Sequence, residues 1–347
     1  MISITQEMIM HNWKSKETLV SIRCVTYNQE KYISQALDSF LMQKTNFPFE
    51  IVVHDDASTD KTIEIIKEYE KKFPDIVKPI YETENQYSKK DNSLDLIILS
   101  HLKGKYTAYC EGDDFWTNKN KLQKQVDFLE QNPDYGFCCT DVDIYYEDKK
   151  KYQHAITKSK KNHLDFTNGI KSTGYLLNLS WLFRTDLYEK IVNENEQFYY
   201  DRPLQLYYEF CLRTKCKYLN CVTGTYRRNP NGISFFSKGQ EQKQYEYFKS
   251  CFLLILKYLP KFNCSQEIES KVYARNIEYV LKPAIQFGDE EIIQIFISYS
   301  TKNKGIFLCE LNDIIFEKEK QIKKTLSYRI GNFLLWPLKK IKGLNIE

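Results

Sequence analysis

The chain has 347 residues and a formal net charge of +4; 42% of its residues are hydrophobic and 28% are charged. These proportions are ordinary for a folded globular protein, and the small net charge argues against a dedicated nucleic-acid binder. The length suggests about two domains.

From residue 20 onward, short apolar runs alternate with helical patterns, which is typical of a parallel sheet with crossover helices. The predicted strands are 20–27, 49–54, 76–81, 106–110 and 136–146. The predicted helices are 29–43, 58–73, 93–102 and one that contains Leu122, Val126 and Leu129 and ends near Asn132. Ser58, Thr59 and Asp60 are expected to cap the second helix.

The pattern changes after residue 146. Residues 147–170 are polar and lysine-rich, which predicts a surface loop. A helix is predicted at about 203–215 and a strand at 218–226, and beyond about 238 the pattern is helical. We therefore predict an α/β domain in residues 1–237 and a helical C-terminal extension in residues 238–347.

Three predicted strands end in polar signatures: Thr26-Tyr27-Asn28, Asp55-Asp56 and Glu111-Gly112-Asp113-Asp114. Taken singly, an acidic pair before Ser58 and Thr59 is more often a helix cap. Together the signatures favour a nucleotide site, because ligands bind at the carboxyl ends of parallel strands. Such a site needs a wall for the base, a carboxylate to accept its imide N–H, and carboxylates for a cation at the diphosphate.

The stretches VSIRCVTYN, EIVVHDDASTD and YCEGDDFW resemble glycosyltransferase family 2. The resemblance implies a GT-A fold, with a mostly parallel Rossmann-like sheet flanked by helices, and sugar transfer with inversion from a nucleotide donor. It implies that Thr26 and Tyr27 lie at the base and that Asp56 accepts from the uracil imide. Asp113 then reaches the ribose, and Asp114 ligates Mn²⁺ or Mg²⁺. Phe115 and Trp116 either wall the site or belong to the core.

Two later segments resemble the same family with departures. The family's general base corresponds to Asp201, although Tyr200 replaces a glycine before it; the alternative is a helix N-cap ahead of Pro203. Tyr226-Arg227-Arg228-Asn229 resembles a Y-R-x-H segment in which Asn229 replaces the histidine. Either arginine could face the leaving diphosphate or simply be solvated surface.

We therefore expect a metal-dependent, inverting glycosyltransferase that uses a UDP-sugar and a saccharide or lipid-linked saccharide acceptor in cell-surface polysaccharide synthesis. One alternative is a sugar nucleotidyltransferase, which needs a glycine-rich phosphate loop that is missing near Asn28. Another is a non-catalytic carbohydrate- or nucleotide-binding protein on the same fold.

The cysteines and the two ends of the chain indicate in which cellular compartment the protein is expected. Ten cysteines, several in apolar stretches, suggest reduced thiols in the cytoplasm. We expect no signal peptide and no membrane-spanning helix. Residues 318–347 carry eight basic and two acidic side chains. An amphipathic helix in 322–347 would either contact the cytoplasmic face of the membrane peripherally or dock on the rest of the chain.

Overall fold

The structure is a computed structural model that describes residues 4–156, 163–164, 177–194, 202–229, 232, 236 and 239–303. The chain forms two compact units, the first ending at Leu254 and the second beginning at Ile255. This division falls inside helix α9 (Glu241–Tyr258), later than the suggested domain boundary at residues 237 and 238. The division of the chain into a catalytic α/β domain (1–237) and a helical extension (238–347) stays a prediction.

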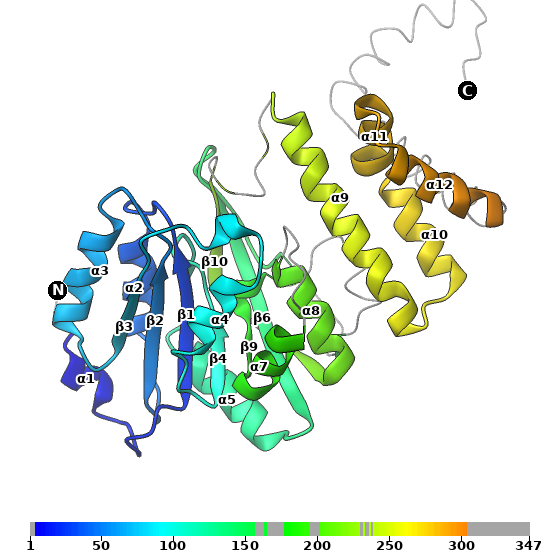
Figure 1. The fold of residues 1–347 in the computed structure, drawn as a ribbon. Helices are drawn as coiled ribbons and strands as arrows, with labels where there is room; N and C mark the ends of the chain where they lie inside the picture. The colour runs from blue at the N-terminus through cyan, green and yellow to red at the C-terminus, as the bar shows by residue number, and fades with distance from the viewer. Residues whose placement is uncertain are drawn as a thin grey trace, which may run out of the picture. The chain divides into compact units, whose positions relative to one another are not determined.

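The first unit is built on a ten-stranded mixed sheet whose path runs β3-β2-β1-β4-β9-β6-β10-β5, with β7 pairing β6 and β8 pairing β10 (Figure 1). The strands are β1 (Val20–Thr26), β2 (Phe49–Asp55), β3 (Val77–Tyr81), β4 (Tyr106–Tyr109), β5 (Phe115–Trp116), β6 (Tyr135–Tyr146), β7 (Lys151–Gln153), β8 (His163–Leu164), β9 (Leu182–Arg184) and β10 (Lys215–Arg228).

Strands β3, β2, β1 and β4 are parallel to one another, as are β6 and β10. Strand β9 lies antiparallel between β4 and β6, and β5 is antiparallel to β10. The predicted GT-A type of sheet is thus confirmed, with antiparallel insertions that the apolar pattern did not single out. Within the predicted loop at 147–170, β7 forms a hairpin with β6, stabilised by the Tyr145 and Tyr152 rings at 4.7 Å.

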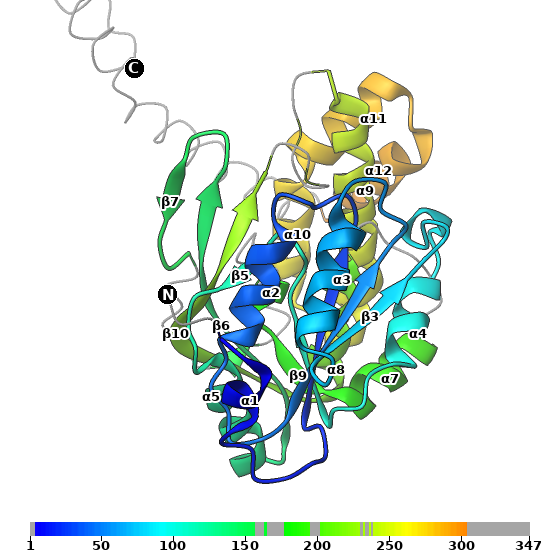
Figure 2. The same cartoon turned by 90° about the vertical axis from the view of Figure 1, so that its left-hand side faces the viewer.

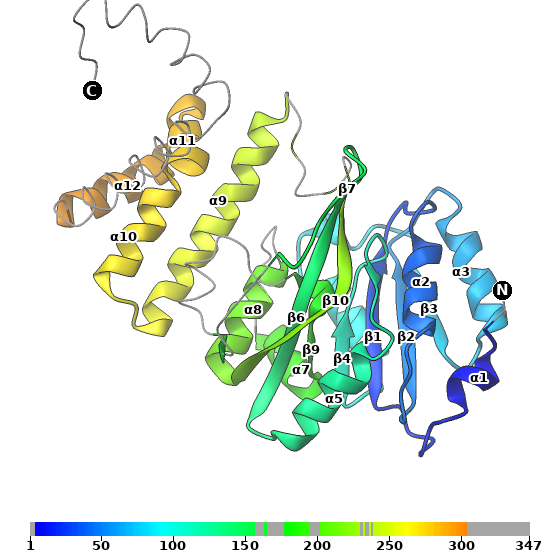
Figure 3. The same ribbon diagram turned by 180° about the vertical axis from the view of Figure 1, so that it is seen from behind.

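Helices cover both faces of this sheet. Helices α2 (Ile33–Leu41), α3 (Thr62–Lys72) and α5 (Lys121–Gln131) pack on one face, as Figures 2 and 3 show. Helices α4 (Ser93–Leu99), α7 (Thr185–Glu194) and α8 (Arg202–Arg213) lie on the other, and the short α1 (Gln6–Met10) precedes β1. Residues of β1 alternate between the faces, so Ile22 and Cys24 join the core under α2 while Arg23 points to the α4 side.

Helix α3 begins later than the sequence suggests, at Thr62 instead of Ser58, and its N-cap position is Lys61, with no side-chain cap. The reason is that Asp60 is used in a turn: its carboxylate accepts from the backbone N–H groups of Thr62 at 2.9 Å and Glu30 at 3.1 Å. The turn therefore connects the start of α3 to the loop after β1.

The described part of the second unit is helical, with α10 (Gln266–Arg275), α11 (Lys282–Phe287) and α12 (Glu290–Lys302) after the end of α9. The Tyr273 and Tyr299 rings stack at 3.7 Å between α10 and α12. The predicted tail helix in 322–347 lies outside the described residues. In the part of the chain that is described, no helix has both the length and the apolar character needed to cross a membrane.

Candidate active site

A cavity of about 420 Å³ opens at the carboxyl ends of β1, β2 and β4. Its lining includes five of the six residues that the sequence analysis assigns to a site: Thr26, Tyr27, Asp56, Asp113 and Asp114. The sixth, Asp201, lies outside the described residues. Three strand ends that are far apart in the sequence therefore contribute to one cavity.

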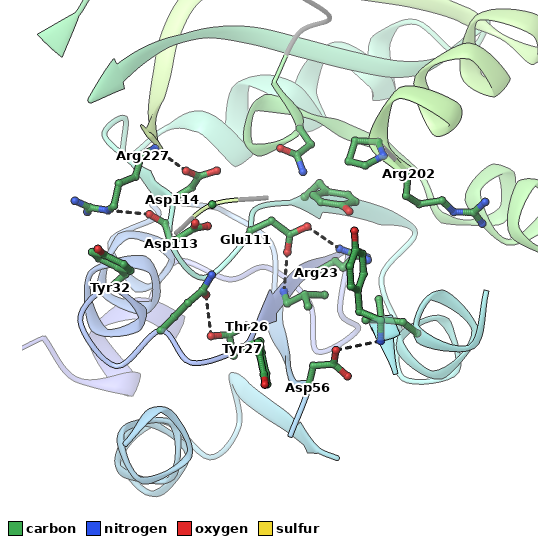
Figure 4. A pocket seen from close by; sticks show the side chains of 18 of the residues that line it. Arg23, Thr26, Tyr27, Tyr32, Asp56, Glu111, Asp113, Asp114, Arg202 and Arg227 are labelled. Carbon is green, nitrogen blue, oxygen red and sulfur yellow. Dashed lines mark hydrogen bonds and ion pairs between the residues drawn. The ribbon is translucent and has the colours of Figure 1, made fainter. Parts of the chain in front are cut away.

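Figure 4 shows how these side chains are distributed around the cavity. Thr26, Tyr27 and Asp56 lie along one side. Asp113 and Asp114 lie beside Arg227 on another, and Glu111 is between them and Arg202. The carboxylates are thus spread around one space and do not point into separate regions of the protein.

Gly112 brings the acidic turn after β4, which comprises residues 111–114, into close contact with β1. Its N–H donates to the Val25 carbonyl at 2.9 Å. A Cβ at this position would lie 2.5 Å from Oε1 of Gln29 and 2.9 Å from Cβ of Thr26, closer than packed atoms tolerate. The backbone approach expected of this glycine is therefore present, and it sets the distance between the two strand ends.

Asp113 and Asp114 lie side by side in a poorly solvated environment. Asp114 is 2% exposed, and its Oδ1 accepts from the Arg227 backbone N–H at 2.8 Å. Asp113 Oδ2 accepts from the Asn229 side-chain amide at 3.0 Å. Burial, reinforced by Glu111, raises the pKa of Asp113 to about 6. Burial and the neighbouring Asp113 hold the pKa of Asp114 well above its ordinary value.

This pair has the chemistry of a cation site that a ligand would complete. In the described residues no three histidine, cysteine, aspartate or glutamate side chains are grouped so as to hold a metal ion. Two neighbouring carboxylates nevertheless suit Mg²⁺ or Mn²⁺, since Mg²⁺ typically takes one or two carboxylates together with phosphate oxygens. The residues therefore fit a cation that bridges to a diphosphate, and they do not form a metal cage by themselves.

Arg227 fixes the acidic turn in place. Its Nε donates to the Asp113 carbonyl at 3.0 Å, its Nη1 to Glu147 at 3.0 Å and its Nη2 to Gln35 at 2.5 Å. Its guanidinium carbon lies 4.8, 5.3 and 5.7 Å from the ring centres of Tyr32, Phe115 and Tyr145, respectively. All three side-chain nitrogens thus have protein partners.

The two arginines of the Tyr226–Asn229 segment differ in environment because they alternate along β10. Arg227 is 7% exposed and faces inward, while Arg228 is exposed. Asn229, at the position of the family's histidine, is buried and contacts Asp113. The segment therefore holds the acidic turn, and of its two arginines only Arg228 is solvated.

Asp56 is 1% exposed, and its carboxylate organises the loop after β3. Oδ1 accepts from the Gln86 N–H at 2.6 Å, and Oδ2 accepts from the Tyr87 N–H at 3.1 Å. These residues begin the short 3₁₀ helix η1 (Tyr87–Lys89). A carboxylate offers about four acceptor positions, so Asp56 retains capacity toward the cavity.

Tyr27 is exposed, with 47% of its surface accessible. The next residue, Asn28, has a φ of 53°, and its side-chain oxygen accepts from the Thr59 N–H at 2.7 Å. This turn places the Tyr27 ring at the cavity wall, where it offers a flat surface. The Thr26 hydroxyl donates to Gln29 at 2.9 Å.

Trp116 settles one of the alternatives left open by the sequence. It is 1% exposed, its ring lies 4.7 Å from Phe40, and its indole N–H donates to the Leu179 carbonyl at 2.8 Å. Trp116 is therefore a core residue. Phe115 is 9% exposed and its ring contacts the Arg227 guanidinium, so it helps to hold the acidic turn and does not form a wall of the cavity.

Sequence reasoning missed a group of buried charges at the other end of the cavity, formed by Arg23, Asp95 and Arg202. The sequence carried one signal of it, since Arg23 interrupts the apolar run of a buried strand. The other two residues, Asp95 in α4 and Arg202 in α8, lie 72 and 179 residues further along the chain than Arg23, and no local sequence pattern links the three.

The model of the family described as "Glycosyl transferase family 2" matches residues 21–192. An uncharacterized protein of Mycobacterium tuberculosis is 45% identical over 132 residues, which cover 38% of this chain and 37% of that protein. The poly(ribitol-phosphate) beta-N-acetylglucosaminyltransferase TarS of Staphylococcus aureus is 32% identical over 115 residues, covering 32% of this chain and 19% of TarS. The matched part is thus well under half the length of these relatives.

Two solved structures share the fold. Residues 1–349 of Staphylococcus aureus TarS, in complex with UDP-GlcNAc, align with a TM-score of 0.59 and 16% identity over 86% of this chain and 92% of that one. A mannosyltransferase of Pyrobaculum calidifontis, in complex with GDP-Man and Mn²⁺, aligns with a TM-score of 0.53 and 15% identity, covering 95% and 90%. The domain in residues 21–192 of this chain therefore belongs to glycosyl transferase family 2, and it has the GT-A fold.

Proposed function

We propose that this protein transfers a sugar, with inversion, from a nucleotide-sugar to a saccharide or lipid-linked saccharide acceptor in the synthesis of a cell-surface polysaccharide. The observation that carries the proposal is the meeting of Asp56, Asp113 and Asp114, from three strand ends, in one cavity. A nucleoside diphosphate needs such a combination, because its neutral base is recognised by hydrogen bonds and its diphosphate requires a cation.

The cavity offers separate groups for the parts of a uridine nucleotide. Tyr27 presents an exposed ring against which a base can stack, and Thr26 lines the same cavity. Asp56 would accept the imide N–H of uracil with the acceptor positions that Gln86 and Tyr87 leave open. These assignments favour UDP over other nucleotides.

Asp113 and Asp114 would act at the ribose and at the cation, respectively. A bound Mg²⁺ or Mn²⁺ would neutralise the charge of the diphosphate leaving group. Arg227 donates through its backbone N–H to the Asp114 carboxylate and through its Nε to the Asp113 backbone carbonyl, so the acidic turn is oriented before the ligand arrives. Asp201 remains the candidate base that takes the proton of the acceptor hydroxyl, on the strength of its sequence position alone.

The likeness to known proteins supports the same class of donor. The TarS structure contains UDP-GlcNAc, and the Pyrobaculum calidifontis mannosyltransferase contains GDP-Man with Mn²⁺. TarS is, by its name, a poly(ribitol-phosphate) beta-N-acetylglucosaminyltransferase. The donor sugar and the acceptor of this chain are left to experiment.

Hydrolysis of a panel of UDP-, GDP- and dTDP-sugars in the presence of Mn²⁺ tests the proposal. We expect turnover of at least one UDP-sugar, and its loss in Asp114→Ala with the melting temperature largely retained. Unchanged turnover in that variant removes Asp114 from the mechanism. Metal-dependent binding of a nucleoside triphosphate and a sugar phosphate, without hydrolysis of any nucleotide-sugar, favours a nucleotidyltransferase instead.

Peripheral contact with the cytoplasmic face of a membrane is the second part of the proposal. It rests on the excess of basic over acidic side chains in residues 318–347. Co-sedimentation with anionic vesicles should fall sharply when residues 322–347 are deleted. Equal sedimentation of the deleted and full chains would assign the tail to packing.

A further inference from the structure

A buried ion-pair network lines the part of the cavity that has no role in the proposal above. Asp95 (α4) accepts at Oδ1 from Arg23 Nη2 at 3.1 Å and from the Tyr188 hydroxyl at 2.7 Å. At Oδ2 it accepts from Arg202 Nε at 2.8 Å. Arg23 also faces the Glu111 carboxylate, at 3.4 Å. Three donors therefore share the Asp95 carboxylate, and two of them are guanidinium groups.

Two donors in the first turn of α8 have no hydrogen-bond partner among the residues that the structure describes. Arg202 is 9% exposed and donates through Nη1 to Gln205 Oε1 at 2.6 Å, but its Nη2 is buried and unpartnered. Gln205 is fully buried, and its Nε2 is also unpartnered. Reversing the amide does not resolve the mismatch, because it would turn an NH₂ group toward the guanidinium. Buried donors, charged ones above all, ordinarily have an acceptor.

The missing partner should carry negative charge and more than one acceptor atom. Arg202 shares the Asp95 carboxylate with Arg23, which also pairs with Glu111, and the first turn of a helix adds positive potential. A guanidinium presents its donors as a planar fork, which matches a carboxylate or a phosphate. A sugar hydroxyl can accept one of these bonds, whereas a carboxylate or a phosphate has enough acceptor atoms for both donors.

We propose that Arg202, supported by Gln205, binds an anionic substituent, a carboxylate or a phosphate, on the donor sugar or on the acceptor. Figure 4 shows Arg202 across the cavity from Arg227, with Glu111 between them, so this subsite is separate from the acidic turn assigned to the diphosphate. The inference rests on the proposed function, because it names the substrate class for the same cavity.

Calorimetry in two arms identifies the source of the anion. In the donor arm, UDP-glucuronate and UDP-glucose are titrated into the full chain with Mn²⁺. In the acceptor arm, the chain saturated with UDP and Mn²⁺ is titrated with glucuronate, glucose 6-phosphate and glucose. In one arm we expect the anionic ligand to bind at least about tenfold more tightly than its neutral counterpart, the worth of one charge-assisted hydrogen bond.

Arg202→Gln should abolish that preference while UDP still binds. Arg213→Gln is the matched control, since it removes the same charge at the other end of α8, where Arg213 pairs with Glu194 and Glu209. If Arg202→Gln does not fold, Arg202→Lys carries the test: it keeps a cation for Asp95 but lacks the fork, and the preference should fall severalfold.

The absence of any preference in both arms overturns the inference, and so does a preference that persists in the Arg202 variant that folds. A chain that binds no UDP with Mn²⁺ refutes the proposed function instead. In that case the acceptor arm is run without UDP and still decides whether the subsite exists.

Discussion

Replacing Arg227 with methionine should destabilise the first unit and weaken nucleotide binding together. The side chain makes three hydrogen bonds, to the Asp113 carbonyl, Glu147 and Gln35, and contacts three aromatic rings. Methionine retains much of the packing but none of the donors. It leaves the Asp113 carbonyl without its Nε donor, while the backbone N–H at position 227 still binds the Asp114 carboxylate.

The expected loss of unfolding free energy follows from the burial of the Arg227–Glu147 ion pair. Breaking a buried ion pair costs about 3–5 kcal/mol of unfolding free energy. The Glu147 side chain is 34% exposed, so solvent screening places the expected loss near the lower end, at about 3 kcal/mol. In a domain of this size, 1 kcal/mol lowers the melting temperature by about 2–4 °C, so we expect a fall of roughly 6–12 °C.

Thermal denaturation followed by circular dichroism measures the first effect, and calorimetry of UDP with Mn²⁺ measures the second. Affinity should fall as well, because Arg227 lowers the pKa values of both Asp113 and Asp114 and its loss makes them harder to ionise. Arg228→Met controls for the stability measurement, since Arg228 is exposed and its loss should cost no more than about 0.5 kcal/mol. A melting temperature of Arg227→Met within about 2 °C of the native value would refute this reasoning.

Two further predictions concern the acidic turn. Burial raises the pKa of Asp113 from 3.8 to about 6, so the metal-free protein should lose stability as the pH rises from about 4 to 6, where the unfolded chain has ionised and the folded one has not. Binding of UDP with Mn²⁺ should correspondingly weaken below pH 6. Asp113→Asn should flatten the dependence of stability on pH. An unchanged dependence in this variant contradicts the raised pKa of Asp113. Gly112→Ala should lower stability by about 1–3 kcal/mol, because the new Cβ would lie 2.9 Å from Cβ of Thr26, which β1 holds in place. Urea denaturation measures the change, and a neutral effect would mean that the turn moves freely away from β1.

The strand ends were readable from the sequence because each is a local pattern. An apolar run that stops at Thr26, Asp55 or Cys110 marks the end of a strand, and the polar residue that follows must lie at the sheet edge. The positions of Asp56, Asp113 and Asp114 around one cavity follow from that rule and from the parallel pairing of β1, β2 and β4.

The rest of the site depends on contacts between distant segments. Arg227 lies 113 residues from Asp114, whose carboxylate its backbone N–H binds. Asp95 joins Arg23 to Arg202 through side chains that belong to three different elements. An arginine in a buried strand indicates a buried acidic partner, but only the packing of α4 and α8 on the sheet identifies it.

The start of α3 shows a similar limit on a smaller scale. Ser58, Thr59 and Asp60 have the composition of an N-cap, yet Asp60 connects Thr62 to Glu30 and the helix begins after it. The preference of these residues for capping also suits a turn, so the sequence placed the helix start four residues early.

Calorimetry of UDP on the native chain and on Asp114→Asn, with and without Mn²⁺, tests the central claim most directly. The account predicts that the native chain binds UDP far more tightly with Mn²⁺ than without it, and that the variant loses most of this difference while its melting temperature stays close to the native one. Equal affinity with and without Mn²⁺, or full metal dependence in the variant, would contradict the claim that the acidic turn and a cation hold the nucleotide together.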